Sequence, residues 1–188
     1  SSDLSLTLMY RKPATTFNQK AEALYQQNVL SVMEEVWHKE GERIDLVIFL
    51  NGIAIFTFEL KCNTSGQNYE DAIRQYKFER DYKTRLLKFK AGCLAHFAMD
   101  LNEVYICTNL KGKSSFFLPF NKGCGVGIHS GKGNPHNENG INVSYMWEDI
   151  LKKDTVLYLI DKIIFLQKET KKDPDTGKRV TKETLIFP

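Results

Sequence analysis

The chain has 188 residues, 42% of them hydrophobic, and a formal net charge of +3. This length and composition suit one folded domain and exclude a disordered chain. No apolar run approaches the roughly 20 residues of a membrane span, and the chain begins without the basic and apolar stretches of a secretory signal. The four cysteines form no C-x-x-C pair, which is typical of free thiols in a reducing, cytoplasmic compartment.

The first elements follow from hydrophobic periodicity. Apolar and polar residues alternate over 4–11, which predicts a half-buried strand. A helix is expected over 19–25, with Thr16 or Asn18 as its N-cap. Residues 29–37 favour a second strand, although the Met-Glu-Glu sequence at their centre leaves a helix open.

The strongest local signal is Asn51-Gly52, which lies between two apolar runs, 44–50 and 53–60. Asn-Gly between β-branched and aromatic runs is typical of a β-hairpin turn. Both runs are nearly continuous rather than alternating, which indicates two strands that are covered on both faces.

The remaining elements complete an α/β pattern. In chain order they are a helix over 69–83 with a basic exposed face, a hairpin of strands over 93–99 and 104–108, a long loop over 110–142, one or two helices over 147–166, and a charged end over 168–182 that is either a linker or a hairpin. We expect a mixed central sheet of about five strands flanked by helices, in a domain over 1–166 followed by a charged segment over 167–188.

Three charged residues interrupt or end the apolar hairpin strands: Asp45, Glu59 and Lys61. A buried carboxylate is costly and two neighbouring carboxylates repel, whereas a divalent cation such as Mg²⁺ compensates both effects. Glu59 and Lys61 are two residues apart on an extended strand, so their side chains leave the same face. An ammonium there can hold the attacking water and stabilise charge on phosphorus. The pattern predicts metal-assisted phosphodiester hydrolysis; the alternative is an ordinary Glu59–Lys61 ion pair, with Asp45 capping a loop.

The length of the turn decides whether the two carboxylates can meet. With a plain two-residue turn, Asp45 faces Phe58, and Asp45 and Glu59 lie on opposite faces of the sheet. A three-residue loop at 50–52 with a bulge pairs Asp45 with Thr57 and brings both carboxylates to one face. We therefore expect an odd-length loop, or one bulge between Asp45 and Glu59.

These motifs together resemble a known family, the N-terminal nuclease region of type I restriction enzyme R subunits, which belongs to the PD-(D/E)xK nuclease superfamily. The resemblance covers most of the chain. It is carried by Arg43-Ile44-Asp45, Asn51-Gly52, Phe58-Glu59-Leu60-Lys61, Ser65-Gly66-Gln67, Asp71-Ala72-Ile73-Arg74-Gln75-Tyr76, Val104-Tyr105, Phe116-Phe117-Leu118-Pro119-Phe120-Asn121, Gly133-Asn134-Pro135 and Tyr145-Met146-Trp147-Glu148.

The resemblance implies a role for each site residue. Asp45 and Glu59 become Mg²⁺ ligands, with the Leu60 carbonyl as a third, and Lys61 becomes the catalytic lysine. Gln75 stands for the glutamine of a downstream helix motif near DNA. That motif often has a tyrosine four residues later, where this chain has Glu79. Only Gln75 is therefore carried over from the motif, and the adjacent Tyr76 is a further candidate. The basic face of the helix adds Arg74, Lys77 and Arg80 as candidate DNA contacts; the alternative is a solvated helix face with ordinary ion pairs.

The resemblance also implies function and partners. It implies an endonuclease domain that cleaves double-stranded DNA with Mg²⁺, within a complex that contains modification and specificity subunits. An ATP-driven translocase motor follows in the family, so residues 167–188 are expected to lead toward it, and ATP serves that motor rather than this chain. The alternatives are a DNA-binding or motor-coupling module that does not cleave, and another nuclease of the superfamily that acts in DNA repair.

Other candidate sites are weaker. The glycine-rich stretch at 123–133 lacks a glycine at 126 and a Ser or Thr at 133, so it does not match a P-loop. Three possible zinc ligands, Cys124, His129 and His136, have irregular spacing. His38 and His96 lie in apolar surroundings and are expected in the core. An upstream carboxylate that many such nucleases use has only weak candidates, which are Glu22 and Glu34.

Overall fold

The computed structural model describes residues 7–15, 17–125, 127–129, 131–172, 174 and 177–187. Within this part of the chain, six strands form one mixed sheet in the order β1-β2-β3-β4-β5-β6. The strands are β1 (Leu30–Lys39), β2 (Glu42–Leu50), β3 (Ile53–Leu60), β4 (Ala95–Met99), β5 (Val104–Cys107) and β6 (Leu118–Pro119). Strands β3 and β4 are parallel and the other neighbours are antiparallel.

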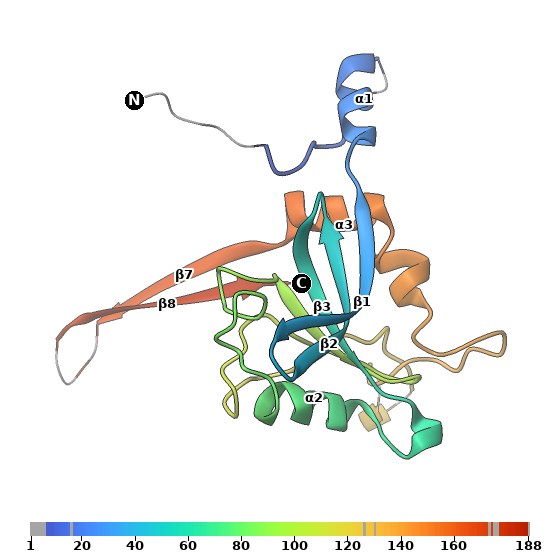
Figure 1. Ribbon diagram of the computed structural model, residues 1–188, viewed down its shortest axis with the longest axis vertical. Helices are drawn as coiled ribbons and strands as arrows, with labels where there is room; N and C mark the ends of the chain where they lie inside the picture. The colour runs from blue at the N-terminus through green and yellow to red at the C-terminus, as the bar shows by residue number, and fades with distance from the viewer. Residues whose placement is uncertain are drawn as a thin grey trace.

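The parallel pair requires a crossover, which contains helix α2 (Tyr69–Phe78). Helix α2 lies across one face of the sheet (Figure 1). Its residues Ala72 and Tyr76 belong to a buried cluster. The other members of this cluster are Ile44, Val47, Leu87, Ala98, Cys107 and Leu110. We call this side of the sheet the α2 face.

The opposite face carries a second, more aromatic core, which includes Phe56, Phe58 and Phe97. It is covered by the chain after residue 143, whose helical elements are η3 (Met146–Ile150), α3 (Lys153–Tyr158) and η4 (Leu159–Ile163). Helices therefore flank the sheet on both faces, which confirms the predicted α/β class with a mixed sheet.

The β2–β3 hairpin confirms the Asn-Gly turn and one of the two predicted geometries. Asn51 and Gly52 have φ angles of 50° and 80°, as in a type I′ turn, and Leu50 pairs directly with Ile53. The three-residue loop is therefore wrong. The register then shifts, because Phe49 pairs with Ala54 whereas Ile48 pairs with Phe56, and this leaves Ile55 as an extra residue. The alternative of one bulge between Asp45 and Glu59 is confirmed.

Several predicted elements differ in extent. Residues 7–11 are not a strand, and 4–6 fall outside the described residues. Helix α1 (Gln19–Gln26) is capped by Asn18, whose Oδ1 accepts a hydrogen bond from the Ala21 amide at 3.0 Å; the other candidate cap, Thr16, also lies outside them. Strand β1 is confirmed. The long loop contains β6 and the short turn η2 (Gly127–His129), and another turn, η1 (Asn63–Ser65), follows β3.

The charged end of the chain forms a hairpin rather than an extended linker. Strands β7 (Phe165–Lys172) and β8 (Arg179–Ile186) pair along their full length and extend away from the sheet (Figure 1). Phe187 then packs edge-on against Phe56, Phe97 and Phe120, with ring centroids 5.6–6.1 Å apart. The hairpin therefore starts and ends at the aromatic core. None of the described helices is long and apolar enough to cross a bilayer.

Candidate active site on the α2 face

The two carboxylates of the predicted site meet on the α2 face. The paired register runs to Leu46 and Phe58, and one further step sets Asp45 opposite Glu59. Thr57 and Glu59 alternate with the aromatic core residues of β3, so they face α2. The Leu60 amide donates to Asp45 Oδ2 at 2.8 Å, which fixes the Asp45 carboxylate against the end of β3.

Glu59 is fully buried and has two charged neighbours. Arg80 Nε donates to Glu59 Oε1 at 2.7 Å, and Arg80 Nη2 donates to Oε2 at 3.3 Å. Burial raises the pKa of Glu59 to about 7; Arg80 opposes this rise, while the nearby Asp45 carboxylate adds to it by repulsion and by accepting a hydrogen bond from the protonated form. Two acidic groups therefore share one pocket and compete for compensating positive charge.

Lys61 directly follows the last residue of β3. Its amide donates to the Met99 carbonyl at 2.9 Å, which anchors it beside the end of β4. Its side chain is partly exposed and forms no hydrogen bond or ion pair with the described residues. Lys61 thus supplies an uncommitted ammonium two residues after Glu59, on the same face.

Asp100 holds the segment that follows the site, a role that the sequence analysis missed. It is buried at the end of β4 and accepts hydrogen bonds from the amides of Tyr69, Asn102 and Glu103 at 2.7–3.1 Å. These bonds connect the β4–β5 turn to the first residue of α2. In the sequence, the only signal for this contact is the polar segment Asp100-Leu101-Asn102 between the two strands predicted over 93–99 and 104–108.

The predicted DNA contacts on α2 have different environments. Arg74 is exposed, and Lys77 and Gln75 are partly exposed. Tyr76 is fully buried, and its hydroxyl lies 2.8 Å from Thr57 Oγ1. Tyr76 is therefore a core residue that is not exposed to a DNA phosphate. Gln75 Oε1 is buried without a hydrogen-bond partner in the described structure.

The histidines expected in the core are buried there. His96 Nδ1 lies 2.7 Å from the Thr57 hydroxyl, and burial lowers the pKa of His96 to about 3. The His38 side chain is also buried, and burial lowers its pKa as well. Both rings are therefore neutral near pH 7.

The upstream carboxylates and the zinc candidates do not complete a metal site in the described structure. Glu22 accepts a hydrogen bond from Gln26 within α1, and Glu34 pairs with Leu46, which lies on the other face of the sheet. No three His, Cys, Asp or Glu side chains gather as metal ligands among the described residues. The side chain of His129, one of the three zinc candidates, is not among them.

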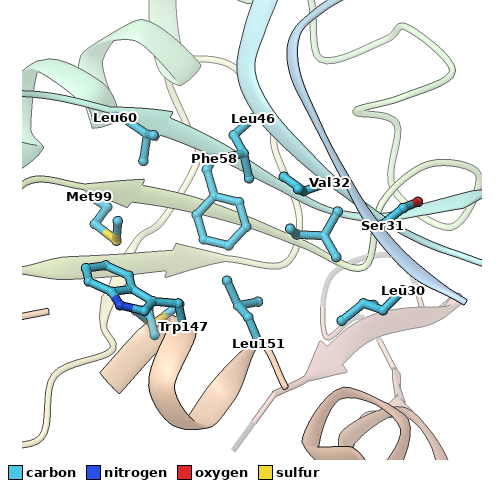
Figure 2. Close-up of a pocket in the computed structure, with 11 residues that line it drawn as sticks. Leu30, Ser31, Val32, Leu46, Phe58, Leu60, Met99, Trp147 and Leu151 are labelled. Carbon is cyan, nitrogen blue, oxygen red and sulfur yellow. The ribbon is translucent and has the colours of Figure 1, made fainter. Parts of the chain in front are cut away.

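An apolar groove of about 490 Å³ lies on the face opposite the carboxylates. Figure 2 shows Phe58, Leu60, Met99, Trp147 and Leu151 around it. Its lining contains no titratable side chain. The groove therefore offers no side chain for acid–base chemistry and no charged metal ligand.

Comparison with known proteins identifies the family of the chain. The family model for the type I restriction enzyme R protein N terminus matches residues 15–115, which is more than half of the chain. The chain belongs to this R protein N-terminal family. Membership confirms the predicted resemblance, and the six-stranded mixed sheet is consistent with a restriction-endonuclease-like fold. All the residues of the candidate site lie within the matched region of this R protein domain. Among curated proteins, no match to the chain is found.

Proposed function

We propose that this R protein domain is the nuclease of a type I restriction enzyme and hydrolyses phosphodiester bonds of double-stranded DNA with Mg²⁺. One observation carries the proposal: Asp45 and Glu59 converge from adjacent strands on one face, and Lys61 follows Glu59 by two residues at the end of β3. Family membership supports a role in restriction but does not by itself assign the chemistry.

The donor set fits Mg²⁺. This ion prefers oxygen ligands and usually takes one or two carboxylates, together with water and phosphate oxygens. Asp45 and Glu59 would hold it, with the Leu60 carbonyl as a third ligand. When bound, Mg²⁺ supplies a Lewis acid and lowers the pKa of a coordinated water. A bound divalent cation would compensate the burial of Glu59 and the repulsion from the partly exposed Asp45, which both raise the pKa of Glu59.

The chain's own residues would do the rest. The Lys61 ammonium would orient the attacking water and stabilise the charge that develops on the phosphorus. Arg74 and Lys77 on α2 would contact the DNA backbone, with Gln75 beside them, so binding would weaken as salt rises. The domain would contact the DNA backbone, and sequence choice would come from the specificity subunit.

The wider assembly is also part of the proposal. The domain would act in a cytoplasmic complex with modification and specificity subunits. An ATP-dependent motor would follow the β7–β8 hairpin in the complete R subunit. ATP would drive that motor and would not bind this domain.

One observation favours a second candidate, a DNA-binding or motor-coupling module that does not cleave. Arg80 already neutralises Glu59 by an ion pair that involves both carboxylate oxygens. A purely structural role for this pair would leave the site without its second metal ligand. The two candidates make opposite predictions for Lys61, whose side chain forms no hydrogen bond or ion pair with the described residues.

The deciding experiment is Lys61→Ala in the assembled, ATP-driven restriction complex. A nuclease loses at least 100-fold in the rate of DNA cleavage, because one group that stabilises the transition state is removed, while ATP-driven translocation continues. Lys20→Ala is the matched control, since Lys20 is an exposed lysine on α1. Cleavage at the wild-type rate by the Lys61 variant would exclude the nuclease and leave the coupling module.

A further inference from the structure

Arg80 forms an ion pair with Glu59, the carboxylate that would be a ligand of the proposed metal ion. Its Nε and Nη2 each contact one oxygen of Glu59, at 2.7 and 3.3 Å. The Glu59 side chain is fully buried and that of Arg80 is only 10% exposed, so water screens the pair weakly. A guanidinium that engages both oxygens of a carboxylate is the strongest form of protein ion pair.

Contacts outside the site hold Arg80 in this position. Immediately after Arg80, the Asp81 amide donates to Glu42 Oε2 at 2.7 Å, and the Asp81 carboxylate pairs with Lys39 at 3.2 Å. Three residues further along the chain, Thr84 Oγ1 lies 3.0 Å from His38 Nδ1. The segment after α2 is thus attached to the ends of β1 and β2, and Arg80 reaches Glu59 from that fixed backbone.

When Glu59 is ionised, as at pH 8, the charges of the site balance without any metal. Asp45 and Glu59 supply two negative charges, and Arg80 and Lys61 supply two positive charges. A divalent cation added to this set creates a local excess of +2 unless a cation leaves or an anion arrives. A unit charge a few ångströms from the ion is a strong repulsion at the effective dielectric of a protein site.

We propose that Arg80 is a gate for metal binding: its guanidinium is the resident counter-ion of Glu59 and has to release the carboxylate before a divalent cation binds to Asp45 and Glu59. Arg80 is therefore a positioning residue and not a ligand. The inference rests on the proposed metal site, since it concerns access to that site. It assigns Arg80 a role different from the DNA contact expected from the sequence.

The test is the affinity of the purified chain for Mn²⁺, measured by calorimetry at pH 8 without DNA. Arg80→Gln removes the competing charge and is expected to bind Mn²⁺ at least tenfold more tightly than the wild type. Arg80→Lys keeps one charge but loses the two-point contact, so its affinity is expected to lie between the two. This conservative variant keeps the test valid if the glutamine variant folds poorly, which circular dichroism would reveal.

Two further variants separate the gate from general effects of charge. Arg85→Gln removes the same charge five residues along the same segment, at an exposed side chain, and its affinity should stay within twofold of the wild type. Glu59→Gln combined with Arg80→Gln should lose the tight binding, because the ligand itself is gone.

The outcomes distinguish the gate from the metal site. Unchanged or weaker Mn²⁺ binding by both Arg80 variants, with wild-type binding still lost in Glu59→Gln, overturns the gate and leaves the metal site standing. Mn²⁺ binding that is indifferent to Glu59→Gln and Asp45→Asn overturns the metal site, and the gate falls with it. Tighter binding that requires both Glu59 and the loss of Arg80 supports both.

Discussion

The two faces of the sheet differ in what they bury, although the same strand supplies both. On one face, Phe56 and Phe58 of β3 pack into an aromatic core, and Phe58 stacks on Phe97 with ring centroids 4.8 Å apart. On the α2 face, Thr57 and Glu59 are equally buried but bond to polar partners. The alternation of side chains along β3 therefore separates its aromatic core residues from the polar residues of the candidate site.

The bulge at Ile55 determines which residues of β2 and β3 share a face of the sheet. Without an extra residue, Asp45 would lie opposite Phe58, on the apolar face. With it, the acidic residues of β2 and β3 come together, and the aromatic residues remain on the other side. One inserted residue thus determines whether the hairpin carries a site.

The largest expected effect on stability comes from a substitution on the face opposite α2. Phe58→Ala should lower the free energy of unfolding by about 3–5 kcal/mol, because it opens a cavity beside Phe97. Urea unfolding followed by circular dichroism measures the change. Phe78→Ala is the control, since that ring is 62% exposed and should cost less than about 1 kcal/mol. Equal effects of the two variants would contradict the assigned core.

Glu59→Gln tests the α2 face through the pH dependence of the free energy of unfolding. The folded state raises the pKa of Glu59 from 4.5 to about 7, so the folded protein holds that proton more tightly than the unfolded chain. The resulting stability is complete below about pH 4.5 and is lost as the pH rises through 7, a fall of up to about 3 kcal/mol.

An amide cannot titrate, so the Glu59→Gln variant should lack this fall. Thermal or urea unfolding from pH 4.5 to 8 measures it, and the exposed Glu138→Gln serves as a control that keeps the wild-type slope. Parallel slopes for the wild type and Glu59→Gln would mean that Glu59 is ionised throughout this range.

The smallest effect concerns the buried polar network that connects the strands to α2. Thr57→Val removes the hydroxyl that lies 2.8 Å from the Tyr76 hydroxyl and 2.7 Å from His96 Nδ1. The loss leaves two buried polar groups with one partner fewer and should cost about 1–3 kcal/mol. Urea unfolding of this variant beside Thr15→Val, an exposed threonine, provides the measurement. No difference between the two would show that the network adds no stability.

Much of the hairpin could be predicted because its signals are local. Asn-Gly specifies the turn, and the continuous apolar runs specify covered strands, so the sequence identified β2, β3 and the acidic residues between them. The alternation of side chains along the two strands left two geometries that bring Asp45 and Glu59 together, an odd-length loop or one bulge. The sequence could not decide between them, because the position of a bulge depends on how Ile55 packs with the rest of the sheet rather than on the turn residues.

The features that escaped prediction depend on long-range contacts. Helix α2 ends at Phe78 rather than near 83, since the amides of Glu79 and Arg80 share the Gln75 carbonyl and the Asp81 amide turns to Glu42. Because the helix ends there, the Arg80 side chain reaches Glu59, which is 21 residues away in sequence. Periodicity cannot show that a basic side chain on a helix end is inside the site, nor that Tyr76 is buried beneath it.

A crystal structure of the chain with Mn²⁺, located by anomalous scattering, tests most directly whether Asp45 and Glu59 share one cation. We expect a single ion bonded to an oxygen of each carboxylate, with the Arg80 guanidinium moved off Glu59. An ion bound to only one carboxylate, or no ion between them while Arg80 still pairs with Glu59, would contradict this expectation.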